Sequence, residues 1–193
     1  MCAFLAEVEY LRLADLTHGF RRPSVMDIKI GAQTYDPLAC AEKVALEKAK
    51  YPWGQELGFR ILGMRVFDKH QQKYHIYGKD YGLKQTPDTV HEAFRTFLGM
   101  THEHPGAPPY LMELLAELEQ IQQWFETQRL LAFYSSSLLI VYESQPDRSS
   151  SRADHCIAKM IDFAHVFPTP ERDENYLFGI CNLIRALQEI AEL

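Results

Sequence analysis

The sequence predicts an α+β fold, in which antiparallel strands form a sheet and the helices are segregated from it. Three observations carry this prediction: two-residue alternation at 24–31, an apolar stripe at helical spacing between 111 and 125, and two apolar segments, 132–143 and 157–163, that read as a hairpin. With 193 residues the chain has the length of one domain around one sizeable core. We therefore treat residues 1–193 as a single domain.

Four segments of the first half read as strands. Residues 6–17 alternate apolar and polar side chains, and 24–31 alternate more strictly, with one apolar face and one mixed face. The apolar face consists of Met26, Ile28 and Ile30, and the mixed face of Val25, Asp27 and Lys29. Residues 58–67 form a further expected strand, and 73–77 form its expected pairing partner.

Four helices are expected. The first begins with Asp36 as its N-cap and Pro37 in the first turn, and it runs to about Lys50. A second begins at Thr86-Pro87 and ends near residue 98, and a longer third one follows Pro108-Pro109. The last covers about 173–192, whereas the serine-rich stretch 144–155 reads as a loop.

Composition narrows the class of protein. Apolar residues make up 47% of the chain and charged residues 24%, which is typical of a globular domain. No apolar run is long enough for a transmembrane segment, and the N-terminus lacks the basic start of a secretory signal. The four cysteines are widely spaced, which disfavours zinc and favours reduced thiols, so we expect a protein of the nucleus and cytoplasm.

Charge is distributed unevenly along the chain. The net charge is −6, yet residues 21–84 contain 12 of the 20 basic and only 7 of the 26 acidic residues. An acidic chain is a poor candidate for nucleic-acid binding, whereas a local cationic patch suits a small, highly charged anion. The alternative is that these lysines form an ordinary solvated face.

The motif Asp27-x-Lys29-x-Gly31 is the first candidate site. Residues i and i+2 of a strand point to the same side, so this carboxylate and this ammonium share one face opposite three apolar residues. An edge-strand ion pair is the structural alternative, and such pairs contribute little stability. Large apolar neighbours argue against it, because a charge buried without a partner is costly.

Two further candidates lie in the second half. Asp162, in Ile-Asp-Phe, ends an apolar strand and either offers hard oxygen ligands to a divalent cation or caps the next turn. His165 follows closely and reads as either a loop histidine or a proton acceptor. Small hydroxyl residues at 135–137 precede a strand that reads as ordinary core.

In their order, these motifs resemble the inositol polyphosphate kinase family. Its signature P-x-x-x-D-x-K-x-G is present from Pro23 to Gly31, and the later segments Ser-Ser-Leu-Leu (136–139) and Ile-Asp-Phe (161–163) follow at suitable distances. The similarity extends over essentially the whole chain. Within the family it is nearest to the inositol polyphosphate multikinase subgroup, on the segments 51–52, 57–59, 62–66 and 161–167.

The resemblance implies a fold and a set of nucleotide-binding roles. The fold would be the C-terminal lobe of such a kinase, similar to protein kinases and ATP-grasp enzymes, with an antiparallel sheet and surrounding helices. The roles fall on Ala14, Asp15 and Leu16 as hinge positions for adenine, on Asp27 for the ATP ribose, and on Asp162 for Mg²⁺ against the ATP phosphates. Residues 1–17 would be the last N-lobe strand and the hinge, and 18–193 the C-lobe.

The resemblance also implies the acceptor site. Lys29 would contact the transferred phosphoryl group and the inositol phosphate, and His165 would orient or deprotonate the inositol hydroxyl; with Asp27 these are the expected catalytic residues. The other expected substrate-binding residues are cationic: Lys43, Lys50, Arg65 and Lys79. Glu47, on the expected substrate-binding helix at about 37–50, would repel a phosphate unless it turns away.

The expected activity is ATP- and Mg²⁺-dependent phosphorylation of inositol polyphosphates such as inositol 1,4,5-trisphosphate and inositol tetrakisphosphate. Phosphoinositide headgroups are further candidate partners, nucleic acid is not, and a monomer is expected. About a dozen residues precede the hinge, so most of the family's N-lobe is expected to be missing, including its nucleotide-binding lysine. A truncated, non-catalytic form that binds inositol phosphates or protein partners is therefore the alternative.

Overall fold

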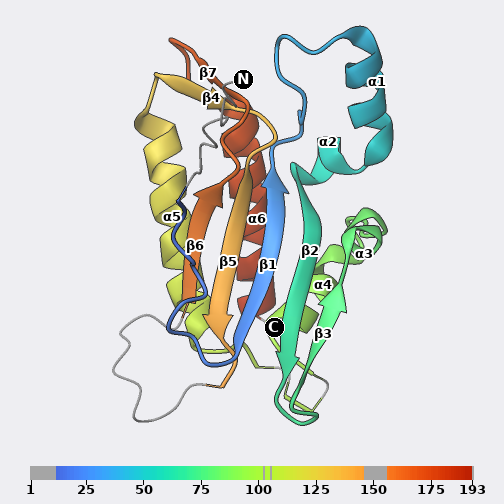
Figure 1. Cartoon of the computed structure of the whole chain (residues 1–193), viewed down its shortest axis with the longest axis vertical. Helices are drawn as coiled ribbons and strands as arrows, with labels where there is room; N and C mark the ends of the chain where they lie inside the picture. The colour runs from blue at the N-terminus through green and yellow to red at the C-terminus, as the bar shows by residue number, and fades with distance from the viewer. Residues whose placement is uncertain (1–11, 102, 105, 146–155, 193) are drawn as a thin grey trace, which may run out of the picture.

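The computed structural model describes residues 12–101, 103, 104, 106–145 and 156–192. Its main sheet is antiparallel with the strand order β3-β2-β1-β5-β6 (Figure 1). These strands are β1 (Pro23–Ile30), β2 (Phe59–Asp68), β3 (Lys73–Tyr77), β5 (Ser137–Glu143) and β6 (Cys156–Ile161). A small second sheet pairs β4 (Leu131–Phe133) with β7 (Val166–Pro168).

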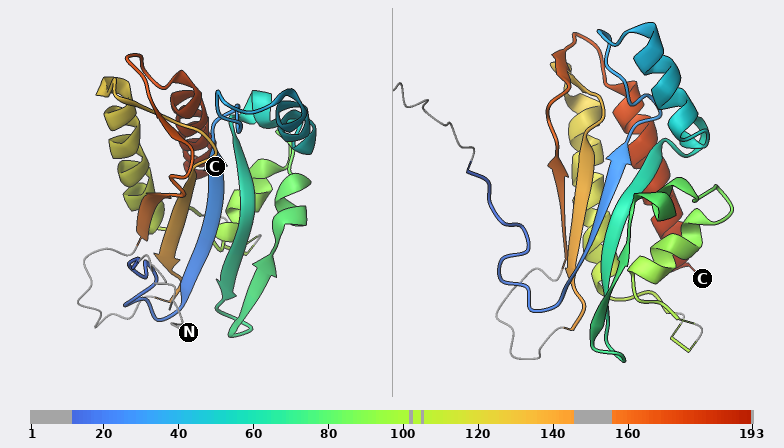
Figure 2. Two further views of the ribbon diagram at one scale, coloured as in Figure 1. Left: turned by 45° about the horizontal axis from the view of Figure 1, so that its top comes forward. Right: turned by 45° about the vertical axis from the view of Figure 1, so that its right-hand side comes forward.

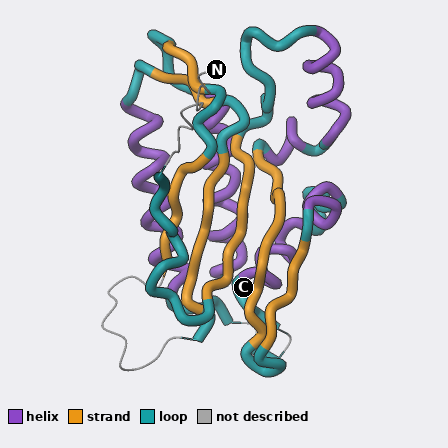
Figure 3. Tube along the Cα trace, viewed as in Figure 1, coloured by secondary structure: helices purple, strands orange, loops and turns teal. Residues whose placement is uncertain are grey.

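The helices lie mainly on one side of the sheet. They are α1 (Ala41–Lys50), α2 (Gly54–Leu57), α3 (Lys79–Leu83), α4 (Val90–Phe97), α5 (Tyr110–Thr127) and α6 (Glu174–Ala191). Helices α4, α5 and α6 pack against the same face of the main sheet (Figure 2). The other face, called here the open face, is not covered by any of these three helices, and α1 stands beyond one end of the strands (Figure 3). No helix in the described ranges is long and apolar enough to cross a membrane.

The core lies between the sheet and α4, α5 and α6. Met26, Ile28 and Ile30 are completely buried, as the alternation of β1 predicts. Tyr176 of α6 stacks on Phe125 of α5, with 3.9 Å between ring centroids. Each such side chain contributes roughly 1.5–3 kcal/mol by leaving water. This packing fixes the sheet and therefore the direction in which the opposite, odd-numbered residues of β1 project.

A β-bulge in β2 keeps the polar residues on the open face. Asp27 pairs with Gly63 and Ile28 pairs with Ile61, so Leu62 is an extra residue in β2. Ile61 and Met64, three positions apart, are therefore both buried on the helix side. Arg60 and Arg65 consequently both lie on the open face, beside β1.

Several expected elements are confirmed. The strand at 24–31, the pair at 58–67 and 73–77, and the long helix after Pro109 correspond to β1, β2 with β3, and α5. The last helix is α6, and Asp173 caps it by accepting a hydrogen bond from the Tyr176 amide. Strands β5 and β6 pair antiparallel, as expected of a hairpin.

Other expectations are wrong, each for a local reason. The expected strand 132–143 is divided into β4 and β5, which belong to different sheets, because Ser135 has a left-handed φ of 58°. The first helix begins at Ala41 rather than after Asp36, whose carboxylate accepts from the Leu38 amide within the preceding turn. The helix expected from Thr86 begins at Val90.

The first expected strand is only partly tested. Residues 12–17 of the expected strand 6–17 are coil and turn, and its remainder lies outside the described residues. Three short elements, α2, α3 and β7, were not expected, because segments of three to five residues carry too little periodicity.

Candidate functional site

Asp27 lies near the middle of the open face. Its side chain is about half buried, and its Oδ1 atom has no hydrogen-bond partner among the described residues. Burial raises the pKa of this carboxyl, opposed by the Ser137 hydroxyl and by the charge of Lys29. A buried oxygen without a donor is costly, and the Oδ1 atom of Asp27 therefore has an unused capacity to accept a hydrogen bond.

Lys29 lies two residues further along the same face. Its ammonium donates to the main-chain oxygen of Ser135 at 2.9 Å, so the connection between β4 and β5 holds it in place. Burial lowers the pKa of Lys29, and the neighbouring charge of Arg60 lowers it further. The ammonium is thus half buried beside a second cation rather than turned to solvent.

Asp162 lies at the same end of the main sheet as Lys29, beyond the last residue of β6. It follows Ile161, which pairs with Ser137, which in turn pairs with Lys29, a separation of two strand spacings or about 10 Å at the backbone. Its carboxylate is near enough to raise the pKa of Asp27 and to oppose the lowering of the pKa of Lys29. Asp162 has a φ of 62° and an exposed side chain.

A shallow groove of about 560 Å³ lies on the Asp27 side of β1. We call it the open groove; its lining is Thr17, Val25, Asp27, Leu62, Gly63, Met64, Arg65, Ile76 and Tyr77. Thr17 belongs to a turn that Asp15 stabilises, because the Asp15 carboxylate accepts from the Thr17 amide at 2.9 Å and from its hydroxyl at 2.7 Å. The expected hinge positions Ala14, Asp15 and Leu16 therefore border the groove that contains Asp27.

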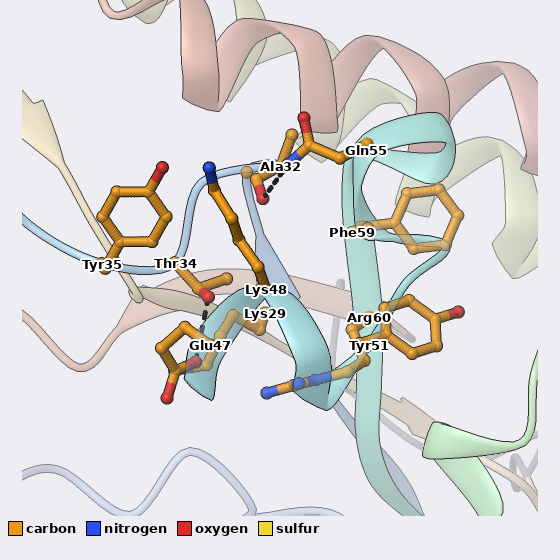
Figure 4. Close-up of a pocket in the computed structure, with 12 residues that line it drawn as sticks. Lys29, Ala32, Thr34, Tyr35, Glu47, Lys48, Tyr51, Gln55, Phe59 and Arg60 are labelled. Atoms are coloured by element: carbon orange, nitrogen blue, oxygen red, sulfur yellow. Dashed lines mark hydrogen bonds between the residues drawn. The ribbon is translucent and has the colours of Figure 1, made fainter. Parts of the chain in front are cut away.

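A deeper pocket of about 280 Å³ lies on the Lys29 side (Figure 4). We call it the cationic pocket; its lining is Lys29, Gly31, Ala32, Thr34, Tyr35, Glu47, Lys48, Tyr51, Gly54, Gln55, Phe59 and Arg60. Three cations face it, Lys29 from β1, Lys48 from α1 and Arg60 from β2. Glu47 is its one acidic residue, and so the pocket is suited to an anion.

Glu47 does not turn away from the pocket, but its charge is already engaged. One carboxylate oxygen accepts from the Thr34 hydroxyl at 3.0 Å, and the other forms an ion pair with Lys50. Burial opposes the charge on Glu47, but these contacts outweigh it and lower the pKa of the carboxyl. The anticipated repulsion of a phosphate is therefore reduced within the pocket wall itself.

Of the four expected cationic substrate residues, none lines the cationic pocket. Lys43 lies 3.7 Å from the Asp36 carboxylate, and Lys50 pairs with Glu47. Arg65 lines the open groove, where its guanidinium lies 4.7 Å from the Tyr74 ring centroid. Lys79 is exposed at the start of α3 and lines neither cavity.

His165 is held by a carboxylate. Its Nδ1 lies 2.8 Å from Oδ2 of Asp36, and its main-chain oxygen accepts from the Tyr134 amide at 2.9 Å. Burial opposes the charge of Asp36, but the Leu38 amide, Lys43 and His165 outweigh it and lower the pKa of that carboxyl. His165 lines neither cavity, so its expected proton-accepting role stays a prediction.

Lys48 and Arg60 are the residues that the sequence reasoning missed. Lys48 lies between the two expected lysines of α1, on the turn that faces Tyr35, with 5.8 Å from Nζ to the ring centroid. Arg60 was read as an ordinary strand residue, although it is the register partner of Lys29. The available signal was an arginine inside the apolar run 59–64, where an unpaired charge is costly.

The arrangement suits transfer of a charged group between two bound molecules. The open groove and the cationic pocket are both lined from β1: Asp27 lines the groove, and Lys29, two residues further along the strand, lines the pocket. No cluster of three metal-ligating side chains occurs within the described ranges. A hard cation bound by Asp162 would thus take most of its ligands from phosphates and water, as Mg²⁺ commonly does.

Comparison with known proteins gives a consistent result. The family model described as inositol polyphosphate kinase matches residues 10–188. Among curated proteins, the inositol polyphosphate multikinases of Rattus norvegicus and Homo sapiens are each 42% identical over 74% and 71% of this chain, respectively. The matched segments cover 36% and 33% of those proteins, so the chain corresponds to about a third of their length.

Other relatives match nearly the whole chain. The inositol polyphosphate multikinase beta of Arabidopsis thaliana is 30% identical over 96% of this chain and 68% of its own length. A solved inositol phosphate multikinase superposes with a TM-score of 0.78 at 27% identity, covering 93% of this chain and 85% of that one. A Saccharomyces cerevisiae multikinase solved with ADP and Mn²⁺ gives 0.71 at 25% identity, over 91% and 81%.

Proposed function

Because this chain belongs to the inositol polyphosphate kinase family, we propose that it transfers the γ-phosphate of ATP to hydroxyls of inositol polyphosphates. The candidate acceptors are inositol 1,4,5-trisphosphate and inositol tetrakisphosphate. The single observation that carries the proposal is that one motif, Asp27-x-Lys29, lines two cavities of different character, Asp27 the open groove and Lys29 the cationic pocket. A donor and an acceptor must meet for direct transfer.

In this proposal the nucleotide occupies the open groove. The unpartnered Oδ1 of Asp27 accepts hydrogen bonds from the ribose hydroxyls, and the backbone of residues 14–16 meets the adenine edge. Asp162 holds a divalent cation, Mg²⁺, which neutralises charge on the ATP phosphates. The yeast relative solved with ADP and Mn²⁺ supports a nucleotide and a divalent cation in this family.

The acceptor occupies the cationic pocket in this proposal. During transfer the bond from the γ-phosphorus to the β–γ bridging oxygen breaks, and a bond to the inositol hydroxyl oxygen forms. The hydroxyl loses its proton, for which His165 is the proposed acceptor, and ADP leaves. Lys29, which lines the cationic pocket two residues along β1 from Asp27, offsets negative charge on the moving phosphoryl group.

The experiment is a radiolabelled phosphate-transfer assay with inositol 1,4,5-trisphosphate, inositol tetrakisphosphate or phosphatidylinositol 4,5-bisphosphate as acceptor. Wild type transfers label to at least one acceptor, and Lys29→Ala loses transfer by about 10²–10³-fold. Equal activity of the two proteins contradicts the role of Lys29.

Calorimetric titration with ATP separates catalysis from the non-catalytic alternative. Mg²⁺-dependent ATP binding by this chain supports the kinase. Inositol phosphate binding without ATP binding or transfer supports the alternative.

Activity in both nucleus and cytoplasm, as a monomer, belongs to the same proposal. Cys40, Cys156 and Cys181 are free thiols, which is compatible with reducing compartments. Fluorescent tagging of the chain in cells, and light scattering of the purified protein, test the location and the oligomeric state.

A further inference from the structure

The Arg60 side chain is buried, and the carboxylate that acts on its charge, Glu47, is engaged with other groups. The residue is only 7% exposed, yet its Nε has no hydrogen-bond partner within the described part of the chain. The nearest aromatic support is Tyr51, whose ring centroid lies 5.8 Å from the guanidinium carbon. A buried charge in this state is unfavourable unless something else compensates it.

Neighbouring charges increase this cost rather than remove it. Lys29 is the direct register partner of Arg60 on β1, and like charges opposite each other destabilise a sheet. Lys48 contributes a third cation from α1. Glu47 is close enough to attract Arg60, but Thr34 and Lys50 already occupy both of its oxygens.

The direction of the side chain shows where a compensating group would sit. In Figure 4 the Arg60 side chain extends along the pocket toward the side where Lys29 and Glu47 lie, rather than away from it. A guanidinium presents a planar set of donors that matches the oxygens of a phosphate, and the two ammonium groups add point charges. A phosphate monoester has the charge and the oxygen atoms that such a set of donors can bind.

We propose that Arg60, together with Lys29 and Lys48, forms a phosphate subsite that binds one existing phosphate of the acceptor and so selects acceptors that carry a phosphate at that position. This inference rests on the proposed function, because it assigns the acceptor to the cationic pocket. The same chemistry serves a soluble inositol polyphosphate and a phosphoinositide headgroup, so the test has one arm for each.

The experiment measures binding without ATP, so it does not depend on catalysis. The full chain is titrated calorimetrically with inositol 1,4,5-trisphosphate and with an inositol tetrakisphosphate. Wild type is compared with Arg60→Leu, with Lys48→Gln and with the control Arg185→Leu, at an exposed site on α6 outside both cavities. A second arm measures sedimentation with phosphatidylcholine vesicles containing phosphatidylinositol 4,5-bisphosphate.

Arg60→Leu weakens binding by about tenfold or more, Lys48→Gln weakens it less, and Arg185→Leu leaves it unchanged. ADP affinity is the same in all four proteins. The free Arg60→Leu protein melts at the same or a higher temperature than wild type, because a buried unpaired charge has been removed. Inositol phosphates raise the melting temperature of Arg60→Leu by less than they raise that of wild type. If Arg60→Leu fails to fold, Lys48→Gln, at an exposed helix position, carries the test.

Wild-type affinity in Arg60→Leu, or no binding of either ligand class by wild type, overturns the subsite. An Arg60-dependent loss confined to vesicles identifies the lipid headgroup as the ligand, and one confined to soluble ligands identifies the free inositol phosphate. Arg60-dependent binding without phosphate transfer would refute the proposed function and leave the subsite standing. Transfer with an unchanged KM in Arg60→Leu would refute only the subsite.

Discussion

Lys29 and Arg60 stand directly opposite each other on neighbouring strands, β1 and β2, with both side chains on the open face. Arg60 is buried and Lys29 is half buried. Burial lowers the pKa of both side chains, and the charge of Arg60 lowers the pKa of Lys29 further. The free protein therefore holds two like charges side by side, an arrangement that a bound anion would stabilise.

Lys29→Met is expected to raise the free energy of unfolding of the ligand-free protein at pH 7 while it abolishes phosphate transfer. The pKa of Lys29 is lower in the folded state than its usual 10.5, so the folded protein loses stability at any pH where the ammonium is charged. The free energy of unfolding of wild type therefore rises as the pH increases from the folded pKa of Lys29 to 10.5. The variant has no ammonium at this position and lacks this rise.

Urea titration at several pH values measures this effect. Lys159→Met, which removes an exposed lysine paired with Glu117, is the matched control and changes stability by no more than about 0.5 kcal/mol. A Lys29→Met protein less stable than wild type at pH 7 would contradict the prediction.

Asp27→Asn tests the second buried charge. Burial raises the pKa of Asp27 above 3.8, so the folded state retains a proton that the unfolded state has already lost. The stability of wild type therefore falls as the pH rises from about 3.8 through the folded pKa, and it stays lower above it. The amide that replaces the carboxyl in Asp27→Asn does not titrate, so the variant lacks this fall in stability. Compared with wild type at the same pH, the variant is therefore more stable at pH 7 than it is at pH 3.

Unfolding free energies of the two proteins across this pH range measure the difference, and calorimetry with ADP measures nucleotide binding, which is expected to weaken. If the free energies of unfolding of wild type and Asp27→Asn changed in parallel with pH, the prediction that burial raises the pKa of Asp27 would be wrong.

His165→Gln is expected to lower kcat by about 10²-fold, with little change in the KM for the acceptor or in ADP affinity. The Asp36 carboxylate, 2.8 Å from Nδ1, holds the ring in one orientation and leaves Nε2 free for the hydroxyl proton. Asp36→Asn is expected to lower kcat to a smaller degree and to change the pH profile of kcat, because it acts only through the ring.

His75→Gln is a matched control, because His75 also faces an aspartate, Asp68, at 3.4 Å, but lines neither the open groove nor the cationic pocket. A wild-type kcat in His165→Gln would exclude the histidine as proton acceptor.

Gly31→Ala is expected to destabilise the fold by about 1–3 kcal/mol and to weaken acceptor binding. Gly31 has a left-handed φ of 101°, and a Cβ atom there would lie 2.4 Å from Nδ2 of Asn175. Gly78→Ala is the control, because a Cβ at that position meets nothing within 4 Å. Urea titration of both variants, with acceptor titration of each, measures the difference; equal stabilities would contradict the steric argument.

The periodicity of apolar residues was sufficient to predict those helices and strands that bury one regular face. The alternation of β1 predicts which residues are buried, and the stripe in α5 predicts its packing on α6, because both periods follow directly from backbone geometry. The division at Ser135 was missed, since apolar residues continue on both sides of it and a single left-handed residue leaves no periodic trace. The start of α1 was misplaced because Asp36 serves a turn and His165 instead of the helix.

The candidate site was predictable to the extent that its residues are neighbours in one strand or belong to a known motif. Asp27, Lys29 and Asp162 were proposed in this way, and their functional roles stay predictions. Arg60 was missed, since its place opposite Lys29 depends on the register between β1 and β2 and on the bulge at Leu62. Pairing between strands is a property of the folded sheet and has no local sequence signal.

The loop that follows β1 is attached to the first turn of α6. The side chain of Asn175 accepts from the Gln33 amide at 2.8 Å and donates to the Gln33 oxygen at 3.0 Å. Two residues earlier, the Asp173 carboxylate accepts from the Phe133 amide at 2.7 Å. Local opening of this loop must therefore disturb the start of α6, a helix of the core. Amide hydrogen exchange at Gln33 should accordingly be slow, with an opening free energy close to that of the amides inside α6.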